Sequence, residues 1–205
     1  MKRIVPGRRP SRDALPATLD RRLYAAVNRL PHQPDTDRLT TLLSDLGKGV
    51  GWAAAGAALA AAGGSRGRRA AVASVGGMLV AVTLVQGPGK TLLRRRRPFV
   101  DRIANVVGTR PSDSSFPSGH TAGSFAAAIA LSVFYPRWRW PAFGLAGAVG
   151  ASRIYLGHHF PSDVAFGAVL GGAVGAVAAR LLRLRPAAGP QGDPEAEIMA
   201  AALIL

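Results

Sequence analysis

The chain has no cysteine, few acidic residues and few aromatic ones. The absence of cysteine among its 205 residues excludes disulfides, thiolate nucleophiles and cysteine-based zinc sites. Only 11 residues are acidic and 26 are basic, so the formal net charge is +15. Such a charge suits either nucleic acid or anionic lipid as a partner. Because no basic stretch is interleaved with aromatic residues, the sequence predicts no nucleic-acid partner and favours membrane lipid.

Charge is also missing from long parts of the chain. Arginine-rich segments separate five apolar blocks that carry at most one charge each, at residues 49–65, 70–89, 121–135, 140–157 and 164–179. Apolar blocks with basic flanks are typical of polytopic membrane proteins, and alanine and glycine let such helices approach closely. We therefore predict an all-α fold, a polytopic membrane helical bundle of about five transmembrane helices.

The residues before the first block predict helices of another kind. Residues 19–31 carry leucine and valine at helical spacing among arginines, which favours a helix lying in the membrane surface. Residues 36–47 fit either a second short helix or the start of the first span.

We expect three regions along the chain. A basic N-terminal tail with interfacial helices occupies residues 1–47, a membrane domain occupies residues 48–185, and a flexible tail occupies residues 186–205. Small-residue faces suit a homodimer as well as one packed bundle, so the oligomeric state stays open.

Three short polar segments lie at the ends of the apolar blocks. The first is Lys90 followed, after six intervening residues, by Arg97-Pro98, and the second is Pro117-Ser118-Gly119-His120. The third is Ser152-Arg153, then His159 after five intervening residues and Asp163 after three more. An up-and-down bundle places all three segments on the same side of the membrane.

These residue types suit phosphoryl transfer, which needs charge neutralisation, a nucleophile and a leaving-group acid. Lys90, Arg97 and Arg153 can neutralise phosphate oxygens, and the planar fork of arginine suits paired oxygen contacts. Ser118 and Gly119 precede a predicted helix, so their backbone N–H groups can face a phosphate oxygen.

Two histidines can divide the remaining work. With Asp163 four residues after His159, the carboxylate can bond one ring nitrogen and leave the other as a nucleophile. His120 can protonate the leaving oxygen and later deprotonate a water molecule. The spacing from Arg153 selects His159 over His158, for which a structural role and a headgroup contact both remain open.

The three segments together resemble the motifs of the type 2 phosphatidic acid phosphatase (PAP2) superfamily. The resemblance spans Lys90 to Asp163 and points to the membrane lipid phosphatase branch, in an actinobacterial style. It implies His159 as nucleophile, Asp163 as its partner and His120 as general acid. It further implies no metal, no cofactor, and phosphate ligands at Lys90, Arg97, Ser118, Gly119 and Arg153. Many membrane members have six spans, whereas five are predicted here.

The predicted function is hydrolysis of a lipid phosphate monoester or diphosphate through a phosphohistidine. Phosphatidic acid and polyprenyl-linked phosphates, such as decaprenylphosphoryl-5-phosphoribose or undecaprenyl diphosphate, are the expected substrates. Two alternatives stay open, a non-catalytic membrane protein that binds anionic lipid or phosphate, and a lipid phosphotransferase.

The charge distribution predicts an orientation in the bacterial cell membrane. Eighteen of the 26 basic residues fall on the side of the three motifs, so the positive-inside rule places the site in the cytoplasm. We interpret Arg94, Arg95 and Arg96 as headgroup-binding charges. The sequence indicates no partner for Asp45, Asp101 or Asp113.

Overall fold

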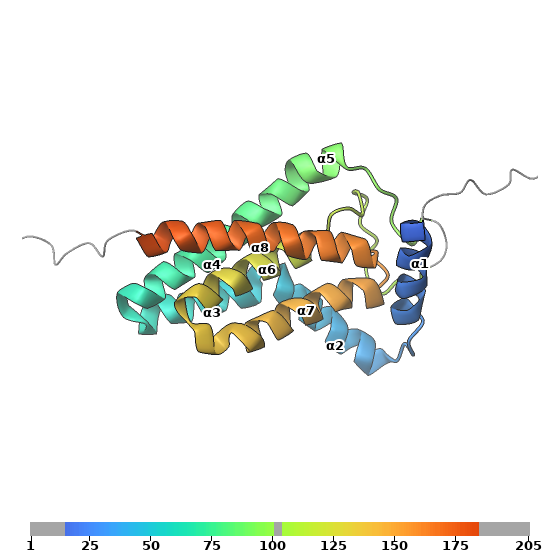
Figure 1. Cartoon of the computed structure of the whole chain (residues 1–205). Helices are drawn as coiled ribbons and strands as arrows, with labels where there is room; N and C mark the ends of the chain where they lie inside the picture. Colours follow the sequence, from blue (N-terminus) through green and yellow to red (C-terminus); the bar gives the residue numbers. More distant parts are fainter. Residues whose placement is uncertain (1–14, 101–103, 185–205) are drawn as a thin grey trace, which may run out of the picture.

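The computed structural model describes residues 15–100 and 104–184, which form helices joined by loops (Figure 1). The predicted all-α fold is confirmed for this part of the chain. Much of the expected N-terminal tail, the whole C-terminal tail at 186–205 and Asp101 lie outside the described residues.

Each of the five apolar blocks forms a helix of one elongated bundle. These helices are α3 (Gly51–Ala62), α4 (Gly64–Leu84), α6 (Gly119–Phe134), α7 (Arg139–Tyr155) and α8 (Pro161–Leu184). Helix α6 contacts α4, α7 and α8 and forms the centre of the bundle (Figure 1). Two helices of the described residues, Gly64–Leu92 and Pro161–Arg183, are long and apolar enough to cross a membrane.

Small residues explain how closely α6 and α8 approach each other. Ala122 and Ala126 of α6 are fully buried. A Cβ atom added at Gly171 or Gly175 would lie only 2.0 or 2.2 Å from the carbonyl oxygens of those alanines. Glycine is therefore required at these two positions of α8, as in close helix pairs of membrane proteins.

Two helices of the bundle continue through local irregularities. Helix α2 (Pro34–Asp45) runs through the wide turn η1 (Leu46–Val50) into α3, and the positive φ of 139° at Gly49 marks the kink. Residues 36–47 thus lead directly into the first apolar helix. Helix α4 runs through η2 (Val85–Gly89) into α5 (Lys90–Leu92), and Pro88 removes a backbone donor there.

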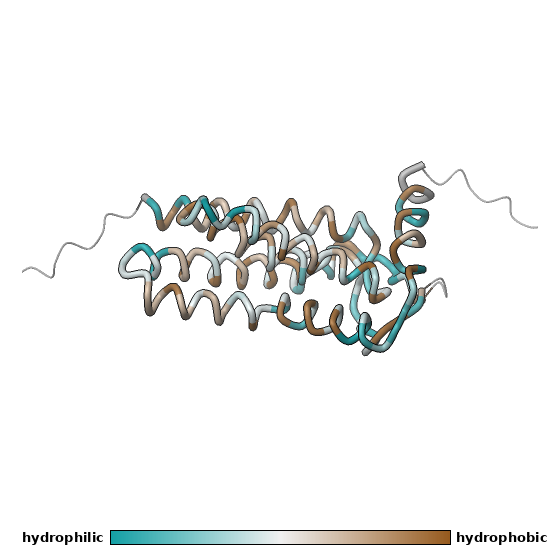
Figure 2. The backbone as a smooth tube through the Cα atoms, turned by 90° about the horizontal axis from the view of Figure 1, so that it is seen from below, coloured by the Kyte–Doolittle hydropathy of each residue, from teal (hydrophilic) through white to brown (hydrophobic). Residues whose placement is uncertain are grey.

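The two ends of the bundle differ in how they are closed. At one end, the single turn η3 (Pro136–Trp138) joins α6 to α7. At the other end, α1 (Leu15–Asn28) lies crosswise to the bundle axis (Figure 1). Tyr24 of α1 is buried against Phe160, with ring centroids 5.3 Å apart. Hydrophilic residues gather toward both ends, and apolar residues dominate between them (Figure 2).

Candidate active site

The three polar segments meet at the end of the bundle that α1 covers. Arg97 lies in the long connection between α5 and α6, and His120 is the second residue of α6. Arg153 lies in the last turn of α7, and Asp163 lies in the first turn of α8. Between them, Gly157 has a φ of 80°, which ends α7 and turns the chain toward His159.

The surroundings of His159 determine which ring nitrogen carries the proton. Its Nδ1 lies 2.6 Å from the carbonyl oxygen of Ser115, which can only accept a hydrogen bond. Its Nε2 lies 3.4 Å from Nη1 of Arg97, which can only donate. The neutral ring is therefore protonated on Nδ1 and carries its lone pair on Nε2, next to a guanidinium.

Asp163 lies beside His159 but is not its hydrogen-bond acceptor. Oδ2 of Asp163 is 3.6 Å from Nδ1, beyond hydrogen-bond distance. This oxygen accepts instead from the hydroxyl of Ser115 at 2.5 Å and from the amide of Phe160 at 2.8 Å. In this structure the backbone carbonyl of Ser115 accepts the hydrogen bond from Nδ1, and Asp163 lies within ion-pair distance of the same nitrogen.

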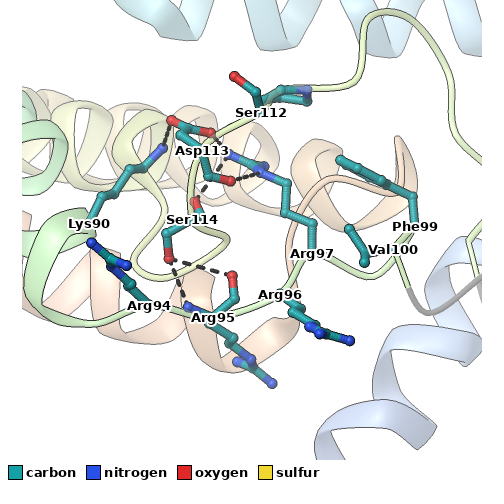
Figure 3. A pocket seen from close by; sticks show the side chains of 11 residues that line it. Lys90, Arg94, Arg95, Arg96, Arg97, Phe99, Val100, Ser112, Asp113 and Ser114 are labelled. Atoms are coloured by element: carbon teal, nitrogen blue, oxygen red, sulfur yellow. Dashed lines mark hydrogen bonds and ion pairs between the residues drawn. The ribbon is translucent and has the colours of Figure 1, made fainter.

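The cations of the first segment share one carboxylate that sequence reasoning left without a partner. Asp113 binds Nζ of Lys90 through one oxygen and accepts from Nη2 of Arg97 at 2.5 Å through the other (Figure 3). Arg97 also donates to the carbonyl oxygen of His158 at 2.8 Å and is only 3% exposed. The Asp113 side chain is 41% exposed, so the carboxylate can be reached from solvent.

A cleft of about 610 Å³ opens on this group of charges. Lys90, Arg97 and Asp113 all contribute to its lining, together with arginines 94 to 96 (Figure 3). His159 and His120 are not part of that lining, but Arg97, which is part of it, reaches Nε2 of His159 at 3.4 Å.

Several buried polar atoms in the site have no hydrogen-bond partner. They are Nε2 of His120, Nε2 of His158 and Nε of Arg153. The other nitrogens of Arg153 are used, since Nη1 donates to Ser44 at 2.6 Å and Nη2 binds Nδ1 of His158. Unpaired buried polar groups are costly, and a bound anion would satisfy the donors among them.

The second segment forms the start of α6, but only in part as expected. The N–H group of Ser118 donates to the carbonyl oxygen of Asp163 at 3.1 Å, and its hydroxyl pairs with Thr121 at 2.9 Å. The expectation that this N–H faces a phosphate is therefore wrong here, because it joins α6 to α8. A Cβ atom at Gly119 would be 3.5 Å from the nearest protein atom, so packing alone does not require glycine there.

The balance of burial and neighbouring charges lowers the pKa of three loop residues, His158, His159 and Asp113. Burial, reinforced by Arg97 and Arg153 and opposed by Asp163, lowers the pKa of His159 to about 4. Burial and the charge of Arg153 lower the pKa of His158 to about 3. Partial burial alone would raise the pKa of Asp113, but the bonds from Lys90 and Arg97 outweigh it and lower that pKa. The ring of His159 is consequently neutral at neutral pH, with the lone pair of Nε2 unprotonated.

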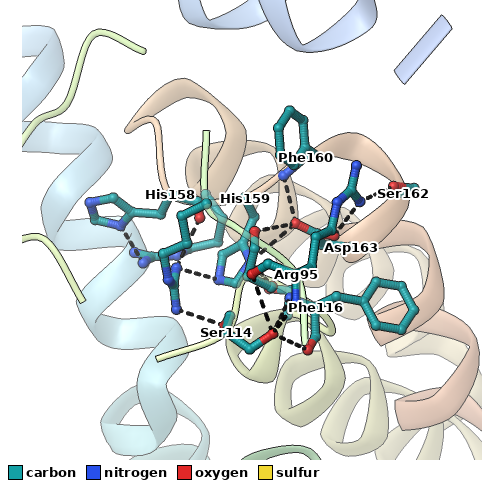
Figure 4. A network of polar contacts seen from close by, with 12 residues as sticks. Arg95, Ser114, Phe116, His158, His159, Phe160, Ser162 and Asp163 are labelled. Carbon is teal, nitrogen blue, oxygen red and sulfur yellow. Dashed lines mark hydrogen bonds and ion pairs between the residues drawn. The ribbon is translucent and has the colours of Figure 1, made fainter. Parts of the chain in front are cut away.

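Arg95 is not the headgroup-binding charge that its sequence context indicates. Its Nη1 lies 2.6 Å from Oδ1 of Asp163 (Figure 4). Its Nη2 lies 2.6 Å from Oδ2 of Asp20. Sequence reasoning missed Arg95, Asp20, Asp113 and Ser115. Of these four residues, only Ser115 had a hint in the sequence, because it stands two residues before Pro117, the first residue of the second polar segment. Asp45, which the sequence analysis left without a partner, accepts at Oδ1 from Nζ of Lys48 at 2.6 Å.

The described residues contain no group of histidine and carboxylate side chains that could hold a metal ion. The arrangement combines cations, a neutral imidazole with a lone pair on Nε2, and a second histidine. These are groups that can bind a phosphate and attack it.

Comparison with known proteins agrees with this chemistry. The chain is 43% identical over 70 residues to an undecaprenyl-diphosphatase of Bacillus subtilis, covering 33% of this chain and 35% of that protein. It is 45% identical over 92 residues to a decaprenylphosphoryl-5-phosphoribose phosphatase of Mycobacterium tuberculosis, covering 43% and 48%. The chain thus spans about half the length, or less, of these curated relatives.

Solved structures share the fold over a larger part of the chain. The crystal structure of LpxE from Aquifex aeolicus matches with a TM-score of 0.65 at 27% identity, covering 79% of this chain and 95% of that one. A transmembrane PAP2-type phosphatidylglycerolphosphate phosphatase of Bacillus subtilis matches with a TM-score of 0.58 at 22% identity, covering 82% and 84%.

The family model of the PAP2 superfamily matches residues 71–186, more than half of the chain. This range contains all three polar segments and the helices α6, α7 and α8. The chain therefore belongs to the PAP2 superfamily.

Proposed function

We propose that the chain is a membrane-embedded phosphatase that hydrolyses the phosphate monoester or diphosphate of a lipid. The observation that carries this proposal is the lone pair of His159 Nε2 beside the guanidinium of Arg97, with Nδ1–H held by Ser115. A binding protein needs cations but has no use for a nucleophile oriented in this way.

In the first step, Nε2 of His159 attacks the phosphorus atom while the bond from phosphorus to the leaving oxygen breaks. The electron pair stays on that oxygen, which takes a proton from His120. Lys90, Arg97 and Arg153 neutralise the phosphate oxygens, with the N–H group of Gly119 at the start of α6 as a further donor. Asp163 stabilises the positive charge that the phosphorylated ring acquires.

In the second step, neutral His120 takes a proton from water as the water oxygen attacks phosphorus. The bond from phosphorus to Nε2 breaks, its electron pair returns to the ring, and inorganic phosphate leaves. The bond from Nδ1–H to Ser115 is unchanged throughout, so the ring keeps its orientation.

A lipid substrate follows from the placement of the site at the end of an apolar bundle. We infer that α3, α4, α6, α7 and α8 lie across the membrane together, with α4 and α8 spanning its apolar thickness. The names of the curated relatives favour a polyprenyl-linked phosphate, with undecaprenyl diphosphate and decaprenylphosphoryl-5-phosphoribose as the first candidates.

The proposal is tested by phosphate release from purified protein in detergent with EDTA present. Phosphatidic acid, undecaprenyl mono- and diphosphate, and decaprenylphosphoryl-5-phosphoribose serve as substrates. We expect EDTA-resistant release that is lost in His159→Ala and retained in the control His32→Gln, since His32 lies outside the motifs. Release from none of these lipids, or equal release by His159→Ala, would contradict the proposal.

We further propose that the site faces the cytoplasm, where the positive-inside rule places it. Because the chain has no cysteine, single cysteines report on topology without background. We expect Thr36→Cys, at the site end, to react with a membrane-impermeant thiol reagent only in opened cells. Arg137→Cys, at the opposite end, should react in intact cells, and the reverse pattern would invert the orientation.

A further inference from the structure

The guanidinium of Arg95 joins two carboxylates that come from opposite parts of the chain. Nη1 lies 2.6 Å from Asp163 at the start of α8, and Nη2 lies 2.6 Å from Asp20 in α1. Both carboxylates are buried, with Asp163 fully enclosed and Asp20 8% exposed. The guanidinium also stacks over the ring of Phe160, 4.1 Å from its centroid. Arg95 is thus fixed on three sides.

Asp163 depends on these contacts for its orientation, because His159 does not bond to it. Arg95 holds Oδ1 and the amide of Phe160 holds Oδ2 (Figure 4). The hydroxyl of Ser115 also donates to Oδ2. Ser115 in turn accepts from Nδ1–H of His159 through its carbonyl oxygen. A continuous series of contacts therefore runs from Arg95 through Asp163 and Ser115 to the imidazole.

Asp20 fixes the other end of this series. Its two oxygens accept from the amide of Ser162 at 2.8 Å and from the hydroxyl of Ser162 at 2.6 Å, and one of them also accepts from Arg95. A carboxylate in this place also suits the positive N-terminal end of α8. Helix α1 is itself anchored, since Asn28 donates to the carbonyl oxygens of Asn105 and Tyr155 at 2.8 Å.

We propose that Arg95 is a positioning residue for the phosphoryl transfer proposed above, and that Asp20 of α1 holds Arg95 in place. Only the kinetic part of this inference rests on the proposed function. Arg95 touches neither the reacting nitrogen nor the groups that neutralise the phosphate. It acts through Asp163, whose other titratable neighbour is the ring of His159, and its removal would release both Asp163 and Ser115.

The kinetic experiment compares Arg95→Gln, Arg95→Lys and Asp20→Asn with the exposed controls Arg38→Gln and Asp35→Asn on α2. Since small displacements of reacting groups are costly, we expect Arg95→Gln to lower kcat about 100-fold and Asp20→Asn about 10-fold. The affinity for vanadate should stay within about twofold of wild type, because the phosphate-binding cations are unchanged. Arg95→Lys should restore part of kcat, and the controls should match wild type.

A second readout needs no turnover and separates this inference from the proposed function. In protein labelled with 15N-histidine, the ring nitrogens of His159 report its protonation as pH changes. Without Arg95, the charge of Asp163 is uncompensated beside the ring, so Arg95→Gln should raise the pKa of His159. Asp20→Asn keeps that compensation and should not raise it.

The outcomes are distinct. If wild type releases no phosphate, the proposed function fails, and the histidine titration alone decides the role of Arg95. If Arg95→Gln folds with an unchanged melting temperature, an unchanged kcat and an unchanged titration of His159, the inference is overturned. A loss of vanadate affinity equal to the loss of kcat would overturn it as well, since Arg95 would then act in binding.

Discussion

Both ends of the bundle are rich in arginine, yet the two sets of arginines have different surroundings. At the site end, Arg97 and Arg153 are 3% and 5% exposed and bind carboxylate, carbonyl and hydroxyl groups. At the opposite end, Arg66 is exposed, donates to the carbonyl oxygen of Phe134 and lies over the ring of Tyr135. The segments that meet there, residues 64–84 and 131–145, contain no acidic residue.

The difference shows that basic charge alone does not make a phosphate site. An exposed arginine at a membrane surface keeps its hydration and interacts weakly with many anions. A buried arginine held by several acceptors is already oriented, so a phosphate that replaces one acceptor meets fixed donors. Burial and neighbouring acceptors therefore separate the site from an interfacial belt of similar composition.

The largest expected effect comes from replacing one arginine at each end by lysine. Arg97→Lys keeps the charge but loses most of the five contacts of the guanidinium, so kcat/KM for lipid phosphate should fall about 100-fold or more. Arg137→Lys at the opposite end should leave kcat/KM unchanged, since Arg137 is exposed. Equal losses in the two variants would remove the distinction between the two ends.

A smaller effect in the opposite direction is expected from Asp113→Asn. The carboxylate of Asp113 already occupies Lys90 and Arg97, so an incoming phosphate must compete with it. Neutralising it should strengthen vanadate binding about tenfold, which corresponds to about 1.4 kcal/mol. Titration of purified protein with vanadate measures this affinity, and Asp35→Asn on the surface of α2 serves as control. Weaker binding would instead show that Asp113 orients the cations.

The smallest effect concerns protonation within the site end. Burial lowers the pKa of His159 to about 4, so its ring should stay neutral as pH falls from 7 to 5. Burial by itself would lower the pKa of His32 as well. Hydrogen bonds to the carbonyl of Asn28 and to Asp37 outweigh burial there, so the pKa of His32 is raised. Histidine 15N spectra should show His32 protonating before His159 as pH falls. Protonation of His159 above pH 6 would contradict its burial in a cationic site.

Much of this molecule could be predicted because its signals are local. Charge-free blocks of alanine and glycine are long enough to specify helices, and arginine-rich segments and prolines mark where they end. The motif spacing likewise brought Lys90, Arg97, His120, Arg153, His159 and Asp163 to one end, since their places relative to the helix ends follow from the block boundaries. Two of the five helices are long and apolar enough to cross a membrane. That the other three also cross it is a prediction.

What the sequence could not supply are contacts between residues far apart in the chain. Asp113 and Ser115 lie in an irregular connection, where no periodicity indicates the direction of a side chain. Asp20 and Arg95 are 75 positions apart, and their contact depends on α1 crossing the end of the bundle.

The sequence by itself determined the helices, their order and most of the candidate residues that meet at one end of the bundle, because these depend on hydrophobicity and short spacings. Only the tertiary structure decided which acceptor holds Nδ1 of His159, which carboxylate occupies the cations and which arginine is part of the site. These features depend on distances of a few ångströms between separate elements, and such distances arise only when the elements pack together.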